Sequence, residues 1–420
     1  MRALMLVLLL VAGVLVFPLI TGCQPEPPPA PPTSPTEEPP TPPATTPEIQ
    51  GDITLLSSTA EVEYPSALTF TMEAESPAEI TEVELEYKID KITTVVLTTR
   101  TTPDFEPAPK VKASCNLDMK KLGGLPPGAE IIYHWEIEDA EGRNLETESA
   151  TVSFDDFRYP WMSLSEETVT LYWYQGDQAF AQELMDAAQT ALEMLAADTG
   201  AQLQRPVKVY IYATYDDLRG AMIYPQEWTG GVAFTEYGIV AIGISPDNLS
   251  WGKKTVAHEL AHLVTYQMTY NPYGDLPTWL NEGLSMYAEG ELTPSEKAIL
   301  NDAIRQDELV SVRSLSSSFP ARGEITLHYV ESYSLVKFLI DTSGREKMLQ
   351  LLGVFKQGKS YDDALLEVYG FDTDGLEDAW RISLGLKPLA ATQALACVAW
   401  AICLIYKDSI VVFGMLNTMI

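Results

Sequence analysis

The sequence predicts a multidomain protein in which a β-sandwich is followed by an α+β domain. Short runs of β-branched or alternating residues, separated by turn residues, fill the segment 49–157. Longer helical patterns begin only after residue 158, with strand-like runs interleaved among them. A length of 420 residues suits roughly two or three domains, and a hydrophobic content of 46% is enough to bury their cores.

The charge and residue counts exclude several classes of partner. Acidic residues outnumber basic ones 59 to 27, which gives a formal net charge of −32. Phosphate binding needs clustered lysine and arginine, so no nucleic-acid partner is expected, and polybasic docking to an anionic membrane is disfavoured. Four cysteines are too few for a disulfide framework. There are only four histidines, and two of them lie four residues apart around a glutamate.

The N-terminus has the form of an export signal. Met1 and Arg2 precede the apolar run Ala3–Ile20, and Ile-Thr-Gly-Cys follows with Cys23 as its last residue. This pattern resembles the lipobox of bacterial lipoproteins. The resemblance implies that Cys23 carries a lipid, and that the protein is exported and anchored to a membrane on its extracytoplasmic face. An ordinary secretory signal and a transmembrane anchor are the alternatives.

A proline-rich segment follows the lipobox. Twelve of the 29 prolines lie between Pro25 and Pro47. Such a composition cannot bury a core and predicts an extended spacer.

The segment 49–157 reads as a small β-sandwich. Its strand-like runs are Glu61–Tyr64, Leu68–Ala74, Ile80–Tyr87, Thr93–Thr99, Glu130–Ile137 and Glu146–Phe154. The stretch 126–143 resembles the late strands of fibronectin-type or immunoglobulin-like modules. Cys115 has no partner cysteine in the segment, so a disulfide-bridged immunoglobulin core is not supported, and His134 is assigned to packing or to the surface. The expected role is spacing or recognition.

The chemistry is concentrated in His258-Glu259-Leu260-Ala261-His262, which lies inside an apolar helical pattern. Residues four apart share one helix face, so the imidazoles of His258 and His262 can bind one Zn²⁺ at about 2.0–2.1 Å. Glu259 projects near the metal without binding it, where it can accept a proton from water. A helix with two histidines and a glutamate facing solvent is the alternative.

A catalytic zinc needs a third protein ligand, and a second motif offers a candidate for it. Trp-Leu-Asn-Glu-Gly occupies residues 279–283, with Glu282 20 residues after His262. The two motifs together resemble the gluzincin metallopeptidases of the aminopeptidase N type, and more closely the peptidase MA-like domains, although the spacing is one residue longer than in the aminopeptidases. The resemblance covers about residues 165–386. It implies a zincin-like fold, Glu282 as the third zinc ligand, and hydrolysis of a peptide or protein substrate.

Three further residues take roles from the same resemblance. The segment Tyr329–Leu339 resembles the part of the family that carries a catalytic tyrosine, which implies that Tyr329 donates a hydrogen bond to the oxyanion. Tyr333, one turn later, competes for this role, and both tyrosines could instead be core aromatics. Glu289 matches an acidic family position and is expected either to bond a ligand histidine or to lie solvated at a helix end. His328 is expected to be a neighbour rather than a participant.

The segment 230–240 predicts the type of peptidase. It occupies the place of the edge strand that holds the substrate backbone in zincins. In the aminopeptidases this strand carries a glutamate that binds the free amine of the substrate, but here Phe234 and Thr235 stand near that position and Glu236 is one residue off. The interpretation is therefore an endopeptidase. The alternative function is a non-catalytic substrate-binding or adhesin lipoprotein with an inactive zincin domain.

The remaining elements of the second half are mostly helical. The strand-like runs are Val169–Trp173, Val207–Tyr212 and Gly238–Ile244, and the helical patterns outside the motifs are Asp177–Ala197, Pro294–Gln306, Arg345–Lys356, Ser360–Val368 and Asp374–Leu384. The run Leu389–Tyr406 contains no charged residue. It reads as a membrane span, a buried terminal helix or a tail unrelated to the fold.

These observations predict five segments. They are a lipoprotein signal peptide (1–22), a proline-rich linker (23–48), a β-sandwich domain (49–157), a gluzincin peptidase MA-like domain (158–386) and an apolar C-terminal tail (387–420).

Overall fold

The computed structural model describes residues 52–93, 96–225, 230–317 and 325–389. The predictions for Cys23, the signal peptide, the proline-rich linker and residues 390–420 of the tail lie outside these residues. None of the described helices is both long enough and apolar enough to cross a membrane.

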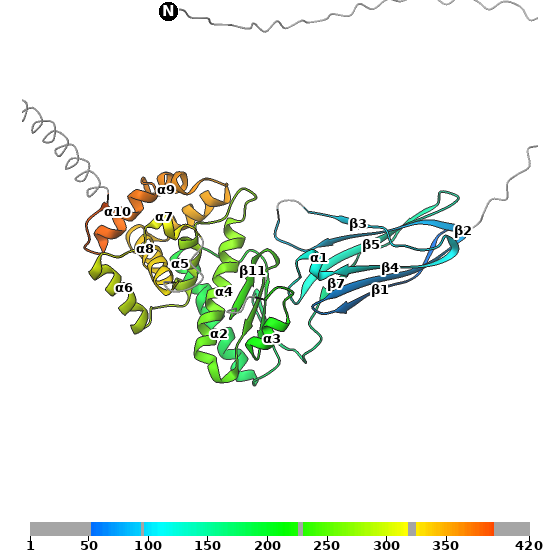
Figure 1. Cartoon of the computed structure of the whole chain (residues 1–420), viewed down its shortest axis with the longest axis horizontal. Helices are drawn as coiled ribbons and strands as arrows, with labels where there is room; N and C mark the ends of the chain where they lie inside the picture. The colour runs from blue at the N-terminus through cyan, green and yellow to red at the C-terminus, as the bar shows by residue number, and fades with distance from the viewer. Residues whose placement is uncertain (1–51, 94–95, 226–229, 318–324, 390–420) are drawn as a thin grey trace, which may run out of the picture. The chain divides into compact units, whose positions relative to one another are not determined.

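The N-terminal part is a curled β-sheet of seven strands (Figure 1). The strands are β1 (Thr54–Glu63), β2 (Ala67–Ile89), β3 (Thr99–Thr101), β4 (Ala108–Asp118), β5 (Ala129–Asp139), β6 (Asn144–Glu146) and β7 (Ala150–Phe154), with a short helix α1 (Met119–Leu122) after β4. Inward and outward residues alternate as in any strand with one buried face, so that Leu68, Phe70, Met72 and Ala74 of β2 are fully buried.

The expectation of an immunoglobulin- or fibronectin-like sandwich is not confirmed. The single long strand β2 pairs with strands that would belong to two different sheets of a sandwich. Residues 67–75 of β2 pair with β1 and β4, and residues 80–89 pair with β5. The register shifts near Ile80 in both the β4 and β5 ladders, and such irregularities bend a strand and increase its twist. One continuous sheet therefore curls around its own core instead of splitting into two layers.

A second sheet has five strands and positions the candidate site. They are β8 (Met162–Glu166), β9 (Val169–Trp173), β10 (Val207–Tyr212), β11 (Gly231–Phe234) and β12 (Ile239–Gly243), in the spatial order β11-β12-β10-β9-β8. β9, β10 and β12 run parallel, whereas β8 and β11 pair antiparallel at the two edges. β9 and β10 have the predicted bounds.

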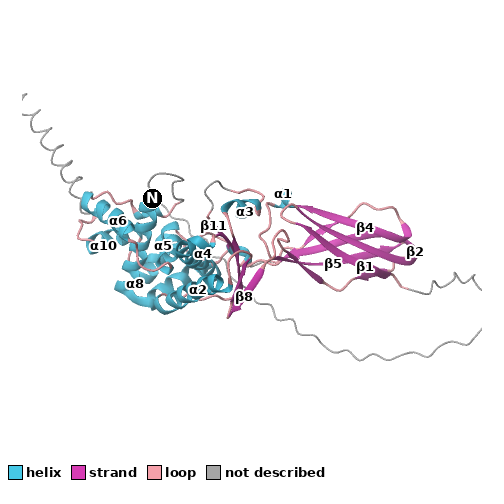
Figure 2. Cartoon of the chain, turned by 90° about the horizontal axis from the view of Figure 1, so that it is seen from below, coloured by secondary structure: helices cyan, strands magenta, loops and turns pink. Residues whose placement is uncertain are grey.

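Helices make up most of the remaining described chain (Figure 2). They are α2 (Gln178–Asp198), α3 (Tyr215–Gly220), α4 (Leu249–Thr269), α5 (Thr278–Ala288), α6 (Pro294–Gln306), α7 (Val312–Leu315), α8 (Ile325–Lys356, broken at Gly344), α9 (Tyr361–Tyr369) and α10 (Thr373–Ser383), with 3₁₀ turns η1 (Thr235–Tyr237) and η2 (Pro246–Asn248). Capping residues define several starts, such as the Thr293–Glu296 capping box of α6 and Ser360 before α9.

Helix α4 is buried on two sides because its apolar residues form two stripes. Val256, Leu260 and Leu263 pack in the core between α2 and the second sheet. Ala257, Ala261 and Val264 pack in the core formed with α5 and α8. This position fixes the rotation of α4 about its axis, and therefore the direction in which its polar face points.

A buried carboxylate on α8 makes the stability of the helical part dependent on pH. Glu331 is fully buried, and both of its oxygens lie 3.2 Å from the amide N–H of Val310. Burial raises the pKa of Glu331 from 4.5 to about 8, an effect that the Val310 N–H opposes and the charge of Glu377 reinforces. The folded state thus holds this proton more tightly than the unfolded chain. Its contribution to stability is complete below pH 4.5 and is lost as the pH rises through 8.

Replacing Glu331 with glutamine should remove this dependence. We expect the variant to match the wild type near pH 5 and to exceed its unfolding free energy by about 2 kcal/mol near pH 9. Denaturant unfolding across this range measures the difference. Glu346→Gln, an exposed change on the same helix, is the matched control. Parallel stability–pH curves for wild type and Glu331→Gln would contradict the expectation.

Candidate metal centre

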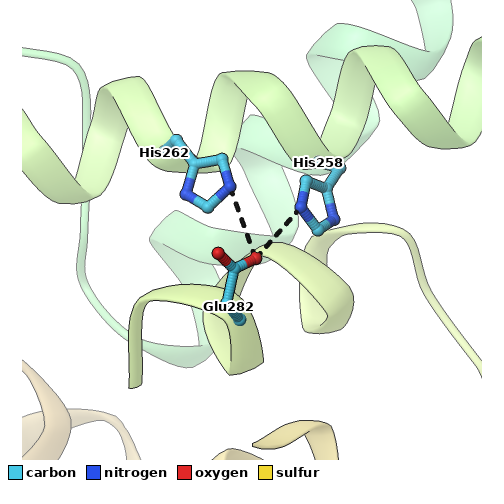
Figure 3. Close-up of side chains that lie close together, drawn as sticks. All are labelled: His258, His262 and Glu282. Atoms are coloured by element: carbon cyan, nitrogen blue, oxygen red, sulfur yellow. Dashed lines mark ion pairs between the residues drawn. The ribbon is translucent and has the colours of Figure 1, made fainter. Parts of the chain in front are cut away.

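Three side chains from two helices converge on one point (Figure 3). His258 and His262 lie one turn apart on α4, and Glu282 lies on α5. Glu282 Oε2 is 3.4 Å from His258 Nε2 and 3.6 Å from His262 Nε2. The structure therefore brings together the three residues that the two motifs predicted as zinc ligands.

One oxygen of the Glu282 carboxylate is not satisfied by a hydrogen bond from any described residue. This oxygen, Oε2, is buried and has no hydrogen-bond partner among the described residues. Burying a charged oxygen without a hydrogen bond is costly, so such an atom favours a further partner such as a cation. One ligand atom from each of the three residues lies within 4.8 Å of the others. Two imidazoles and one carboxylate form a donor set that zinc uses in catalytic sites, so these residues fit the ion.

The electrostatics of the three residues also favour a cation. Burial disfavours the charged form of His258, but its contacts with the Glu282 and Glu289 carboxylates outweigh burial and raise its pKa to about 10. Burial likewise opposes the charge on Glu282, whereas His258 and His262 lower its pKa. A concentration of negative charge that retains a proton at His258 is suited to hold a metal ion instead.

The second ring nitrogen of each histidine, Nδ1, also lies close to polar side chains. Glu289 Oε1 lies 2.8 Å from His258 Nδ1, and Lys254 Nζ lies 3.6 Å from the other oxygen of Glu289. Asn281 Oδ1 and Ser285 Oγ lie 3.2 and 3.1 Å from His262 Nδ1. Contacts at Nδ1 fix the ring so that Nε2 faces Glu282.

Sequence reasoning singled out Glu289 but not Lys254, Asn281 or Ser285. Asn281 directly precedes Glu282, and Ser285 follows it by three residues on the same helix. Their position beside Glu282 in the motif is the sequence signal that could have identified them.

Glu259 lies against the edge strand β11. A Cβ atom added to Gly231 would sit only 2.9 Å from Glu259 Oε1, so the absence of a side chain at Gly231 lets the strand pass close to this carboxylate. The segment predicted as the substrate-holding strand therefore does lie at a sheet edge and beside α4.

Tyr329 and Tyr333 occupy different surroundings. The ring centroid of Tyr329 is 6.1 Å from that of His258. Burial raises the pKa of Tyr329, and the charges of Glu282, Glu259 and Glu289 raise it further, so its phenol keeps its proton. Tyr333 stacks on Tyr287 at 6.2 Å, in a cluster with Met286, Leu292 and Val330 against which Tyr329 also packs. His328 is buried, with 8% of its surface exposed.

A second group of possible metal ligands lies on the N-terminal sheet. It includes His134, for which the sequence predicted a packing or surface role. His134 lies near Glu86 and Glu136, and these three could also hold a metal. However, the Arg100 guanidinium pairs with Glu86 at 2.7 Å and with Glu136 at 3.1 Å. These carboxylates already pair with an arginine, whereas the ion-pair partners of Glu282 are the two histidines.

Comparisons with known proteins agree with the peptidase interpretation. Residues 187–385 match the family model of the Peptidase MA superfamily, which supports a zincin-like peptidase domain in this part of the chain. No significantly similar sequence was found among curated proteins.

Several solved structures are similar in part. Wild-type OgpA from Akkermansia muciniphila is 14% identical, with a TM-score of 0.20, and the match covers 25% of this chain and 30% of that one. Aminopeptidase A from Legionella pneumophila is 10% identical, with a TM-score of 0.37 and coverage of 79% and 51%. The M1 zinc metallopeptidase from Deinococcus radiodurans is 12% identical, with a TM-score of 0.32 and coverage of 79% and 92%. Because these TM-scores are low, the assignment rests on the family match and on the geometry of the site.

Proposed function

We propose that the second half of the chain is a zinc-dependent peptidase, with His258, His262 and Glu282 as the zinc ligands. The observation that carries this proposal is the buried Oε2 of Glu282, which makes no hydrogen bond with any described residue and lies 3.4 and 3.6 Å from the Nε2 atoms of the two histidines.

The chain's own residues support hydrolysis of a peptide bond. When bound, zinc supplies a Lewis acid that polarises a carbonyl and lowers the pKa of water. Glu259 would accept a proton from the attacking water and return it to the leaving amine. Tyr329 keeps its phenolic proton and can donate a hydrogen bond to the oxyanion. The free edge of β11 can pair with the substrate backbone.

An endopeptidase fits these surroundings better than an aminopeptidase. The carboxylate nearest the expected amine-binding position is that of Glu236, and its Oε2 pairs with Lys91 Nζ at 3.1 Å. A carboxylate already paired with a lysine is a poor anchor for the free amine of a substrate.

The place of action is the cell surface. Cys23, at the end of the Ile-Thr-Gly-Cys pattern, would carry the lipid, and the proline-rich segment 23–48 would hold the catalytic part away from the membrane. The substrate is then a peptide or protein met on the extracytoplasmic face of that membrane.

The test is metal content and hydrolysis by the full chain. We expect about one zinc per chain and cleavage of internal bonds in a mixed peptide library, with equal rates for peptides with free and blocked N-termini. Cleavage that requires a free N-terminus would contradict the endopeptidase assignment. Bound zinc without cleavage of any peptide would favour the non-catalytic binding lipoprotein, and a chain that binds no zinc would refute the site itself.

Replacing Tyr329 with phenylalanine should lower kcat by about a hundredfold and leave KM and zinc content nearly unchanged, because only the hydrogen bond to the oxyanion is lost. Steady-state kinetics with a cleavable peptide measures the effect. Tyr333→Phe is the matched control, since Tyr333 packs against Tyr287. If kcat fell further in Tyr333→Phe than in Tyr329→Phe, Tyr333 and not Tyr329 would be the donor to the oxyanion.

Replacing Glu289 with glutamine should weaken zinc binding by about ten- to a hundredfold, because the charged contact that orients His258 becomes neutral. Competition with a chelator of known affinity measures the change. Glu291→Gln, an exposed change two residues away, should leave the affinity as it is. Equal zinc affinity in wild type and Glu289→Gln would show that this contact does not support the ligand.

A further inference from the structure

A cavity of about 190 Å³ opens beside the candidate metal centre. Its lining includes His262 and Asn281, which belong to that centre, and it extends along α4 to Tyr266, Tyr270 and Asp275. We refer to this cavity as the Asp275 groove. The groove and the candidate metal centre share His262. A substrate bound at the metal centre would therefore lie next to the groove.

We propose that the Asp275 groove receives a lysine or arginine side chain from the amino-terminal side of the scissile bond, and that Asp275 determines this preference. The inference rests on the proposed peptidase function and adds a substrate class to it: peptides with a basic residue next to the cleaved bond.

The direction of the substrate follows from β11 and α4. Gly231, at the start of β11, lies over Glu259, and Thr235, just after its end, lines the groove near His262. The strand and the helix therefore run in the same direction past the site. A peptide that pairs antiparallel to β11, the stronger of the two ladders, places its amino-terminal residues beside Thr235 and in the groove.

The charge in the groove is negative and uncompensated. Asp275 forms no ion pair with any described residue, whereas Glu236 nearby is paired with Lys91. Lys359, which lines the adjoining cavity with Asp275, is paired with Glu367. Burial raises the pKa of Tyr266, and the charges of Tyr270, Glu236 and Asp275 raise it further, so the negative charge of Asp275 acts on the ring of Tyr266 in the groove.

Aromatic rings add a second attraction for a cation. Tyr266 and Tyr270 lie with ring centroids 5.1 Å apart, and both line the groove. The face of a tyrosine ring attracts an ammonium or guanidinium group, and the alkyl stem of lysine or arginine packs on the same apolar surface.

The loop that carries Asp275 is held in place before any substrate binds. Asn271 Oδ1 accepts hydrogen bonds from the amides of Tyr273 at 2.9 Å and Gly274 at 3.2 Å. Asn271 Nδ2 donates to the carbonyl oxygen of Phe355 at 2.9 Å, which ties the loop to α8. A carboxylate on a fixed loop loses little entropy when it pairs with a ligand.

Peptide binding to the zinc-loaded full chain carrying Glu259→Gln tests the inference without requiring turnover. The probes are four blocked, fluorescent peptides of otherwise neutral sequence that differ at one position, with lysine, arginine, glutamine or glutamate. We expect the lysine and arginine peptides to bind about tenfold more tightly than the glutamine peptide. Asp275→Asn should abolish this difference, and Asp275→Lys should shift the preference to the glutamate peptide.

Asp247→Asn, an exposed change near the start of α4, is the matched control and should retain the preference. Equal binding of the lysine and glutamine peptides, no binding of any of the four, or a preference that survives Asp275→Asn would overturn the inference. Products of the wild-type enzyme mapped by mass spectrometry should place the basic residue before the cleaved bond, and a position after that bond would also overturn it. Selective binding without cleavage by the wild type would instead refute the peptidase proposal and leave the binding preference intact.

Discussion

Replacing Glu259 with glutamine is expected to lower kcat/KM by about a thousandfold while the chain keeps its zinc. The substitution retains the size of the side chain but removes its ability to accept a proton. Glu259 does not belong to the group of three residues that can hold the metal, so the ligands remain in place. Metal analysis and peptide hydrolysis on the same preparation measure both quantities.

The control for this experiment is Glu193→Gln, an exposed change on α2 that should leave both activity and zinc content as in the wild type. If Glu259→Gln retained most of the activity, another group would have to accept the proton. If it lost zinc together with activity, the residue would act as a ligand or hold one, and the role proposed for it would be wrong.

Replacing Gly283 with alanine is expected to destabilise the fold by about 3 kcal/mol and to weaken zinc binding. A Cβ atom at this position would lie 2.4 Å from the carbonyl oxygen of Ser332 and 2.6 Å from Val336 Cγ2, so α5 and α8 would have to move apart. Glu282 directly precedes Gly283 and would move with α5. Denaturant unfolding and zinc titration measure the two effects.

Gly353→Ala is the matched control. No atom lies within 4 Å of a Cβ added at this position in α8, so the alanine should raise stability by about 0.5 kcal/mol through its higher helix propensity. If the two substitutions had similar effects on stability, the close packing at Gly283 would not be the reason that a larger residue is excluded from this position.

The sequence predicted those elements whose signals are local. β9 and β10 have the predicted bounds, and so does α6, because a capping box marks its start. β4 was missed because its buried positions alternate with Lys110, Lys112 and other polar residues of low strand propensity. The curled sheet could not be predicted, since it depends on which strands pair along the 23 residues of β2.

In the candidate site, too, the sequence predicted the local features but not those that depend on tertiary packing. The spacing of His258 and His262 places them on one face of a helix, and the structure brings Glu282 to both histidines. The contacts of Asn281 and Ser285 depend on how α5 packs against α4, which no local pattern encodes. Asp275 lies in a loop without a motif, and its place beside the site is visible only once the chain is folded.

Helix α5 has a consequence for how the centre assembles. Asn281, Glu282 and Ser285 lie within this single helix and Glu289 follows at its end, so one helix carries the proposed ligand and also the groups that contact both histidines. When α5 packs against α4, all of these groups come into contact with the histidines together. When α5 separates from α4, all of these contacts are lost together. With Glu282 as the proposed zinc ligand, metal binding and docking of α5 are linked equilibria: the metal would shift the population toward the docked state, and a mutation that loosens the helix interface would lower metal affinity without changing a ligand.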